Sequence, residues 1–273
     1  MADLDQNQQQ AIVRDRFTRT AEVFGNAVMQ TRAVEAEILA EMVAARKNDW
    51  AVDLACGTGA LAVAFSRHVR WIMGLDLTPA MLAVAQRAAR EANARNIAFA
   101  LGNAQDIPFP DASLDLTLSS YALHHVPEPG RVIGEMSRVL KRGGRAGIID
   151  IFAQEDQRSA EMHDRIERVR DPSHVRTLAR SEFASLFAEH HMRIIGTHVE
   201  EHPATFDQWM HNAGWEPSDP EYIATRRLME GTMPDDLAAF HPRYSAATAA
   251  GRDEVPGIEM VNAVVFLSAE KIG

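Results

Sequence analysis

The feature that most constrains the fold is an alternation of short apolar runs with longer amphipathic segments between residues 50 and 150. Short apolar runs bounded by turn residues predict strands, whereas apolar residues at helical spacing predict helices. Regular alternation of the two is typical of a parallel sheet covered by helices on both faces. We therefore predict strands at 50–55, 71–76, 97–101, 114–120 and 145–150, and helices at 59–69, 79–93 and 129–141.

The flanking segments extend this core. Apolar spacing predicts helices at 6–24 and 31–45 before it, and near 154–170 and 181–190 after it. Strands at 192–199 and 258–267 complete the sheet, and six prolines between residues 200 and 256 indicate an insertion. The predicted fold is α/β, with a doubly wound, mostly parallel seven-stranded sheet. Its predicted parts are a helical lid (1–48), a core (49–199), a helical insertion (200–257) and a last core strand (258–273).

Composition argues against several functions. The formal net charge is −10 without a compensating basic run, so nucleic acid is not an expected partner. The first residues are acidic and no run of 18 apolar residues occurs, so we expect a cytoplasmic protein without a membrane span. Cys56 is the single cysteine, which excludes an internal disulfide and thiol chemistry on a soft substrate such as arsenite. We expect no metal site, and the sequence leaves open whether the protein forms a homodimer.

The loop after the first predicted strand, residues 53–59, lies where parallel α/β sheets bind ligands. Its glycines also fit a dinucleotide fingerprint, so they leave an NAD-dependent oxidoreductase open. The carboxylate of Asp53 disfavours a pyrophosphate and suits a ligand with an ammonium and a sulfonium. Asp76, at the end of the second strand, is placed to accept hydrogen bonds from ribose hydroxyls.

Four spaced motifs point to one family: Val52 to Gly59, Gly74 to Leu82, Gly102 to Phe109 and Tyr121 to Val126. In this order they resemble the class I methyltransferases that use S-adenosylmethionine (SAM). The resemblance is narrower to the branch of the ubiquinone and menaquinone C-methyltransferases, with a methyltransferase type 11 domain. It implies a Rossmann-like fold and methyl transfer to carbon, oxygen or nitrogen of a small molecule, with S-adenosylhomocysteine (SAH) as product.

The resemblance also implies roles for single residues. Asp53 would face the methionyl end of SAM, Asp76 the ribose, and Asn103 the adenine edge. The family usually has aspartate at that last position, so Asn103 would bind without a charge. Two lid residues, Phe17 and Phe24, would contact the cofactor. The further expected cofactor contacts are Ala55, Cys56, Gly57, Thr58, Gly59, Leu77, Met81, Ala104, Gln105, Ser119 and Tyr121.

The acceptor side is harder to predict. His124 and His125 follow the fourth strand, where either imidazole could take a proton from an acceptor, or the pair could only shape the turn. A polar cluster from Arg170 to Arg176 could bind an acceptor oxygen or form a surface ion-pair turn. The expected acceptor contacts are Tyr121, His125, Arg170, His174 and Trp209. One alternative stays open: a SAM-binding protein that transfers no methyl group and acts as a cyclase or interaction module.

Overall fold

The computed structural model describes residues 6–27, 29–232, 234–237, 239–240, 243–244 and 258–273. The side chains of 24–27, 29–31, 234–235 and 243–244 lie outside that description. In the described part of the chain, no helix is long and apolar enough to cross a membrane.

The strand order of the central sheet is β3-β2-β1-β4-β5-β9-β7. The first five strands pair in parallel, and β9 pairs antiparallel with both β5 and β7. The predicted α/β fold with a mostly parallel sheet is therefore confirmed. The strands are β1 Trp50–Leu54, β2 Trp71–Asp76, β3 Ile97–Leu101, β4 Leu114–Ser120, β5 Leu140–Ala153, β6 Leu178–Ala179, β7 Met192–Thr205, β8 Arg243–Tyr244 and β9 Ile258–Lys271.

Helices cover both faces of this sheet. Buried side chains of α2 and α3 pack on one face, and those of α5 and α7 pack on the other. The helices are α1 Gln6–Ala27, α2 Met29–Met42, α3 Ala60–Phe65, α4 Pro79–Glu91, α5 Pro129–Val139, α6 Gln157–Arg170, α7 Arg180–Glu189, α8 Phe206–Asn212 and α9 Pro220–Glu230. Short 3₁₀ turns cover Ser66–His68, Leu123–His125 and Pro234–Leu237.

Strand β7 is longer than predicted. It runs to Thr205, so residues 200–205, predicted as the start of the insertion, continue the sheet. Its register with β9 is unbroken from Gly196 to Thr205, opposite Glu259. Polar residues and Pro203 do not form a strand pattern, so the sequence did not predict this extension. An edge strand tolerates both because the backbone groups along its outer edge need no partner strand.

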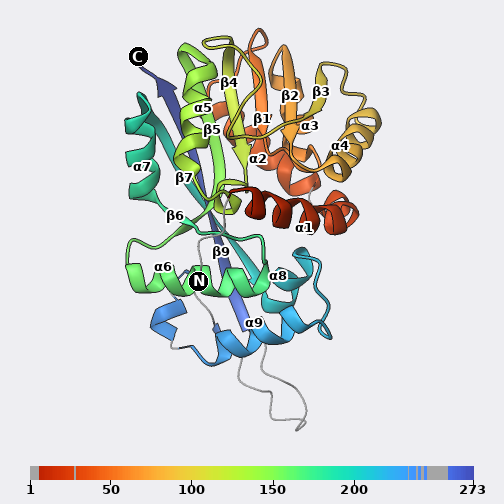
Figure 1. Cartoon of the computed structure of the whole chain (residues 1–273), viewed down its shortest axis with the longest axis vertical. Coiled ribbons are helices and arrows are strands. Elements are labelled where there is room, and N and C mark those ends of the chain that lie inside the picture. Colours follow the sequence, from red (N-terminus) through yellow and green to blue (C-terminus); the bar gives the residue numbers. More distant parts are fainter. Residues whose placement is uncertain (1–5, 28, 233, 238, 241–242, 245–257) are drawn as a thin grey trace.

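A second layer lies below the carboxyl ends of the parallel strands (Figure 1). It contains α6, α8 and α9, whose apolar side chains form a separate core around Phe206, Trp209 and Phe240. In Figure 1, α1 crosses the gap between the sheet and this layer, and the long strands β7 and β9 run through both. A ligand site at the strand ends is thus roofed by α1 on one side and by the second layer on the other.

Candidate active site

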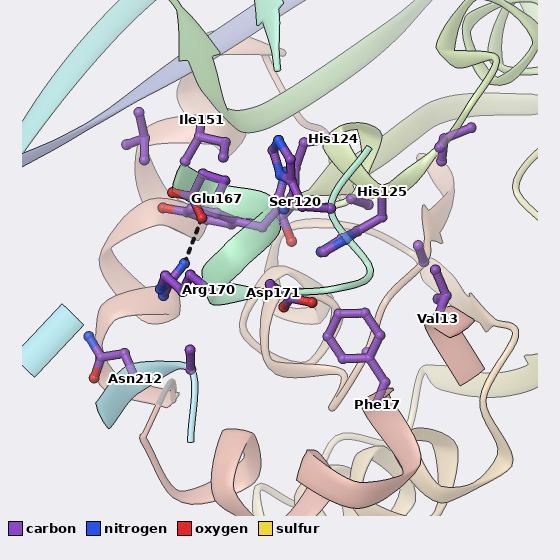
Figure 2. Close-up of a pocket in the computed structure, with 18 of the residues that line it drawn as sticks. Val13, Phe17, Ser120, His124, His125, Ile151, Glu167, Arg170, Asp171 and Asn212 are labelled. Atoms are coloured by element: carbon purple, nitrogen blue, oxygen red, sulfur yellow. Dashed lines mark hydrogen bonds and ion pairs between the residues drawn. The ribbon is translucent and has the colours of Figure 1, made fainter. Parts of the chain in front are cut away.

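A cavity of about 680 Å³ lies at the carboxyl ends of β1, β2 and β4 and continues toward α6 and α8 (Figure 2). Its wall includes most of the predicted site residues. On the cofactor side these are Phe17, Ala55, Cys56, Gly57, Thr58, Asp76, Leu77, Met81, Asn103, Ala104, Gln105 and Tyr121, and on the acceptor side His124, His125, Arg170, His174 and Trp209.

The loop after β1 is held in a left-handed backbone conformation. Ala55, Gly57 and Gly59 all have positive φ, of 53°, 54° and 73°. At Gly59 an added Cβ would lie 2.7 Å from the Cβ of Ala85, so glycine is required there for packing as well as for conformation. Gly59 itself does not line the cavity; it lets the loop turn tightly enough for Gly57 and Thr58 to do so.

Asp76 ties this loop to the end of β2. Its Oδ2 accepts a hydrogen bond from the backbone N–H of Gly57 at 2.8 Å, and its Oδ1 accepts one from Thr78 at 2.8 Å. Burial raises the pKa of Asp76 above its ordinary value, although these two N–H groups act in the opposite direction. Each carboxylate oxygen can accept a further hydrogen bond, so Asp76 can bind hydroxyl groups of a ligand in the cavity.

Asp53 is buried behind the loop and does not line the cavity. Neither of its carboxylate oxygens accepts a hydrogen bond of normal geometry from the described residues. Burial, and then the neighbouring charge of Asp76, raise the pKa of Asp53 to about 8. A direct contact between Asp53 and a ligand therefore stays a prediction, but its carboxylate favours a positive charge nearby.

Ser119 is a second predicted contact that does not line the cavity. Its hydroxyl donates to the backbone oxygen of Leu54 at 3.2 Å, which joins β4 to β1. Its side chain is buried within the sheet, and the next residue, Ser120, lines the cavity instead. Successive side chains of a strand point to opposite faces, so Ser120 faces the cavity where Ser119 does not, and a cofactor contact of Ser119 stays a prediction.

The other end of the cofactor side is closed by the loop after β3 and by α1. The Oδ1 atom of Asn103 accepts a hydrogen bond from the backbone N–H of Gln105 at 2.9 Å, which shapes this loop. Gln6 of α1 donates to the side-chain oxygen of Gln105 at 2.9 Å. Asn103 and Gln105 both line the cavity, so the first turn of α1 lies over the region predicted to bind adenine.

The lid helix α1 also reaches the acceptor side. Gln9 donates to the backbone oxygen of Ser173 at 2.7 Å, and the ring of Phe17 meets that of His125 edge-on at 5.1 Å between centroids. Phe17 lines the cavity, as predicted for a lid residue. Phe24 lies in the same helix, but its side chain is outside the described residues.

His124 lines the cavity and is held by a buried carboxylate. Its Nδ1 lies 2.5 Å from Oδ1 of Asp150, and the backbone N–H groups of Leu123 and Ile151 donate to the same carboxylate. Burial alone would lower the pKa of His124, but Asp150 outweighs it and raises the pKa above the ordinary 6.5. Because Nδ1–H donates to Asp150, the ring nitrogen left to accept a proton is Nε2. This Nε2 has no hydrogen bond to the described residues.

His125 has the opposite electrostatic environment. Burial and the neighbouring His124 lower its pKa below the ordinary value, so it stays neutral. Its Nδ1 lies 3.1 Å from the backbone oxygen of Ser173. A third imidazole, His174, stacks on His124 at 5.6 Å between centroids and is fixed through Nε2 by Asp164 at 2.9 Å.

The polar cluster that follows α6 divides into two parts. Arg170 lines the cavity, donates to Glu167 at 3.0 Å and to the backbone oxygen of Trp209 at 3.0 Å, and lies 4.3 Å from the centre of the Trp209 ring. Arg176 does not line the cavity; it pairs with Glu182 at 2.7 Å. The surface ion-pair alternative thus describes Arg176, whereas Arg170 belongs to the site.

Tyr121 lines the junction of the two sides and has a positive φ of 50°. Its hydroxyl donates to Oε1 of Glu35 at 2.8 Å, and the guanidinium of Arg32 lies 3.8 Å above its ring. Burial raises the pKa of the phenol, so Tyr121 keeps its proton at neutral pH. It can position a ligand but cannot serve as a base.

Comparison with known proteins identifies the family. A family described as a methyltransferase domain matches residues 52–148. YcgJ, an uncharacterized methyltransferase of Bacillus subtilis, is 31% identical over 205 residues, which cover 75% of this chain and 81% of YcgJ. The crystal structure of YcgJ is similar with a TM-score of 0.78 and 26% identity, covering 88% of this chain and 99% of that one. The chain belongs to the class I methyltransferases.

Two further likenesses define the range of the family. The 2-phytyl-1,4-naphtoquinone methyltransferase of Synechococcus elongatus is 39% identical over 112 residues, covering 40% of this chain and 48% of that protein. The [4+2]-cyclase SpnF shares the fold with a TM-score of 0.55 and 19% identity, covering 88% of this chain and 80% of that one. The predicted resemblance to class I methyltransferases, including quinone methyltransferases, is confirmed.

SAM is the cofactor of this methyltransferase. The cavity wall fits it, because Asp76 offers two carboxylate oxygens to hydroxyl groups of a ligand. Because the chain belongs to the methyltransferases, the NAD-dependent oxidoreductase that the glycines left open is rejected.

Several residues of the cavity wall were not predicted from the sequence. On the cofactor side they are Gln9, Gln10, Val13 and Arg32. On the acceptor side, His163 and Glu167 precede Arg170 by seven and three residues on α6, a spacing that places them on one face of a helix. Asp150, which pairs with His124 but does not line the cavity, follows an apolar run in the sequence, as Asp53 and Asp76 do, and this shared position could have identified it.

Proposed function

We propose that this methyltransferase transfers the methyl group of SAM to an oxygen, nitrogen or carbon atom of a small molecule, with His124 as the general base. The observation that carries the proposal is the buried pair of His124 and Asp150, which engages Nδ1 of the imidazole and leaves Nε2 of a cavity-lining histidine to accept a proton.

SAM supplies an electrophilic methyl group on a sulfonium, a good leaving group, so the protein has to orient the acceptor and exclude water. An acceptor atom that carries a proton, such as a phenol oxygen or an acidic carbon, becomes nucleophilic as it loses that proton. His124 Nε2 would take this proton as the acceptor atom bonds to the methyl group that SAM would supply, and neutral SAH would be the leaving group. Asp150 stabilises the imidazolium that results.

His124 suits this role better than His125 because a base must bind the proton firmly near neutral pH. The pKa of His124 is raised by Asp150 after the opposing effect of burial, whereas burial and His124 lower the pKa of His125. His125 instead contacts Phe17 of the lid and is tied to the backbone of Ser173. Its proposed role is to position the acceptor and the closed lid.

The enclosure of the cavity supports a small acceptor. The cavity is shared with SAM and is bordered by α1, by α8 and by side chains of α6. Arg16 of α1 pairs with Asp171 at 3.4 Å and donates to the backbone oxygen of Ala213, so the lid is tied to the second layer as well as to the core. A polymer would have to displace these contacts, and the net charge of −10 would repel a nucleic acid.

The direct test is SAH formation from SAM with a panel of phenols, amines and carbon acids, followed by mass spectrometry. Methyl transfer predicts SAH and a product heavier than its acceptor by one methylene unit. The alternative, a cyclase or interaction module, predicts tight SAM binding without SAH from any acceptor, and that result would refute the proposal. SpnF shows that this fold also occurs in a cyclase, so this measurement is needed.

A further inference from the structure

The wall of α6 that faces the acceptor side contains a buried carboxylate that the proposed methyl transfer does not use. Glu167 is 4% exposed and lines the cavity together with Arg170 (Figure 2). Its Oε2 accepts a hydrogen bond from Arg170 at 3.0 Å. Its Oε1 lies 3.7 Å from Nε2 of His163, too far for a hydrogen bond, and has no other partner among the described residues.

Glu167 is ionised in this position. Burial alone would raise its pKa, but the charge of Arg170 and the contact with His163 lower it below the ordinary value. Oε1 is not among the buried atoms that lack a partner, so this oxygen is open to the cavity. A ligand that displaces water from an ionised carboxylate has to replace the lost hydrogen bond. The group that does so at Oε1 must be a hydrogen-bond donor, since a carboxylate can only accept.

Arg170, unlike Glu167, offers no free terminal atom to a ligand. One terminal nitrogen donates to Glu167 and the other to the backbone oxygen of Trp209, and the guanidinium stacks on the Trp209 ring. The backbone oxygen of Arg170 also accepts a hydrogen bond from Trp215 at 2.7 Å. Both terminal nitrogens are therefore committed to the protein, and of the guanidinium only the buried Nε has no partner among the described residues.

Three charged residues of α6 and the loop after it line the cavity: Glu167, Arg170 and Asp171. Arg170 pairs with Glu167, and Arg16 of α1 pairs with Asp171, so the four charges balance. A ligand therefore meets the open oxygen of Glu167 and not an excess of charge. Asp171 is already held by Ser173 and by Arg16, so Glu167 is the group with unused capacity. In Figure 2, Glu167 and His124 project into the same part of the cavity.

We propose that Glu167 binds a protonated amine of the methyl acceptor, so that the acceptor is a small cationic amine whose methylated atom lies beside His124. This rests on the proposed methyl transfer and names the class of its acceptor. An ammonium that donates to Oε1 forms a charge-assisted hydrogen bond in a site that excludes water, where such bonds are strongest. A neutral acceptor of the same shape gains less, and a carboxylate is repelled.

Three phenols of similar size test the proposal: tyramine, 4-ethylphenol and 3-(4-hydroxyphenyl)propionate. Their affinities are measured by calorimetry with the full chain saturated with SAH. We expect tyramine to bind about tenfold more tightly than 4-ethylphenol, which corresponds to one charge-assisted hydrogen bond, and the propionate to bind most weakly. Tightest binding of the propionate, or no binding of tyramine up to millimolar concentration, would overturn the proposal.

Variants of α6 assign the preference to Glu167. Glu167→Gln should bind tyramine and 4-ethylphenol equally, whereas Glu161→Gln, an exposed position on the same helix, should leave the tenfold difference unchanged. The pair Glu167→Gln/Arg170→Gln leaves no unpaired buried charge and should also lose the preference. A preference that persists in either Glu167 variant that still binds SAH contradicts the proposal.

The same titrations separate this proposal from the proposed function. If the unaltered protein fails to bind SAH, the methyltransferase assignment itself fails. If SAH binds and tyramine shows no preference, only the amine proposal fails.

Discussion

The cofactor side and the acceptor side of the cavity are built in different ways. The cofactor side consists of consecutive loops at the ends of β1, β2 and β3, held by backbone contacts such as those of Asp76 with Gly57 and Thr78. The acceptor side is assembled from side chains of α1, α6, α8 and the long strands β7 and β9. One side is a local property of the chain, whereas the other depends on how distant segments pack.

The two sides also differ in their ionic groups. On the cofactor side, Asp53 is buried with no hydrogen-bond partner among the described residues, and its pKa is raised to about 8, by burial first and then by Asp76. On the acceptor side, Asp150 and Glu167 each have a partner, His124 and Arg170. The cofactor side thus has a buried carboxyl group that a nearby cation would help to ionise, whereas the acceptor side holds a base in a fixed orientation.

The largest expected effect on the cofactor side is that of Asp76→Ala. Loss of two charge-assisted hydrogen bonds to the ribose should weaken SAM binding by about 100-fold or more. Calorimetry with SAM measures it, and Asp106→Ala, in an exposed position of the loop after β3, should change the affinity little. SAM affinity that stays within a few-fold of the original would show that Asp76 does not hold the cofactor.

A smaller effect is expected from removal of residues 1–26. The lid contacts Gln105 on one side and Ser173 on the other, so its loss exposes the cofactor to water on both sides of the cavity. We expect tight SAM binding to be lost, by about tenfold or more, while circular dichroism shows a folded core. Arg14→Ala, an exposed change on α1, serves as the control. Unchanged SAM affinity in calorimetry would show that α1 does not act as a lid over the cofactor.

The smallest expected effect is a pH dependence of the protein's stability, caused by Asp53. Its folded-state pKa is raised from 3.8 to about 8, so the stability gained by keeping it protonated is present at acid pH and is lost as the pH rises toward 8. The amide of the variant Asp53→Asn would stay neutral throughout. Without cofactor, the melting temperature of Asp53→Asn relative to that of the unaltered protein should therefore rise by a few degrees as the pH goes from 5 to 8. Asp106→Asn should show no such trend, and a constant difference for Asp53→Asn would contradict the raised pKa.

The sequence predicted the cofactor side because its contacts lie close together along the chain. A glycine loop, an acid at the end of β2 and a polar loop after β3 follow one another in a fixed order, so a pattern can represent them. Even there, the sequence pointed to Ser119, whereas the neighbouring Ser120 lines the cavity. The pleat of a strand decides which of two neighbouring side chains faces a cavity, and an apolar run in the sequence does not define that pleat.

The acceptor side could be predicted only in part. Arg170, His174 and Trp209 were expected and do line the cavity, but Glu167 and His163 were missed although they share a helix face with Arg170. Residues 200–205 were assigned to an insertion and instead extend β7. Long-range pairing with β9 fixes that strand, and a single polar segment gives no sign of its partner.

The central claim is that His124 acts on the acceptor and that SAM binds without its help. The most direct measurement is the rate of SAH formation for His124→Gln as a function of pH, together with its affinity for SAM. We predict that SAM affinity is retained and that turnover falls by about 100-fold. Activity of the unaltered protein should rise with pH through a pKa above 6.5, because the base must be neutral, and this rise should be absent in the variant. Full activity of His124→Gln with the same pH profile would contradict the account.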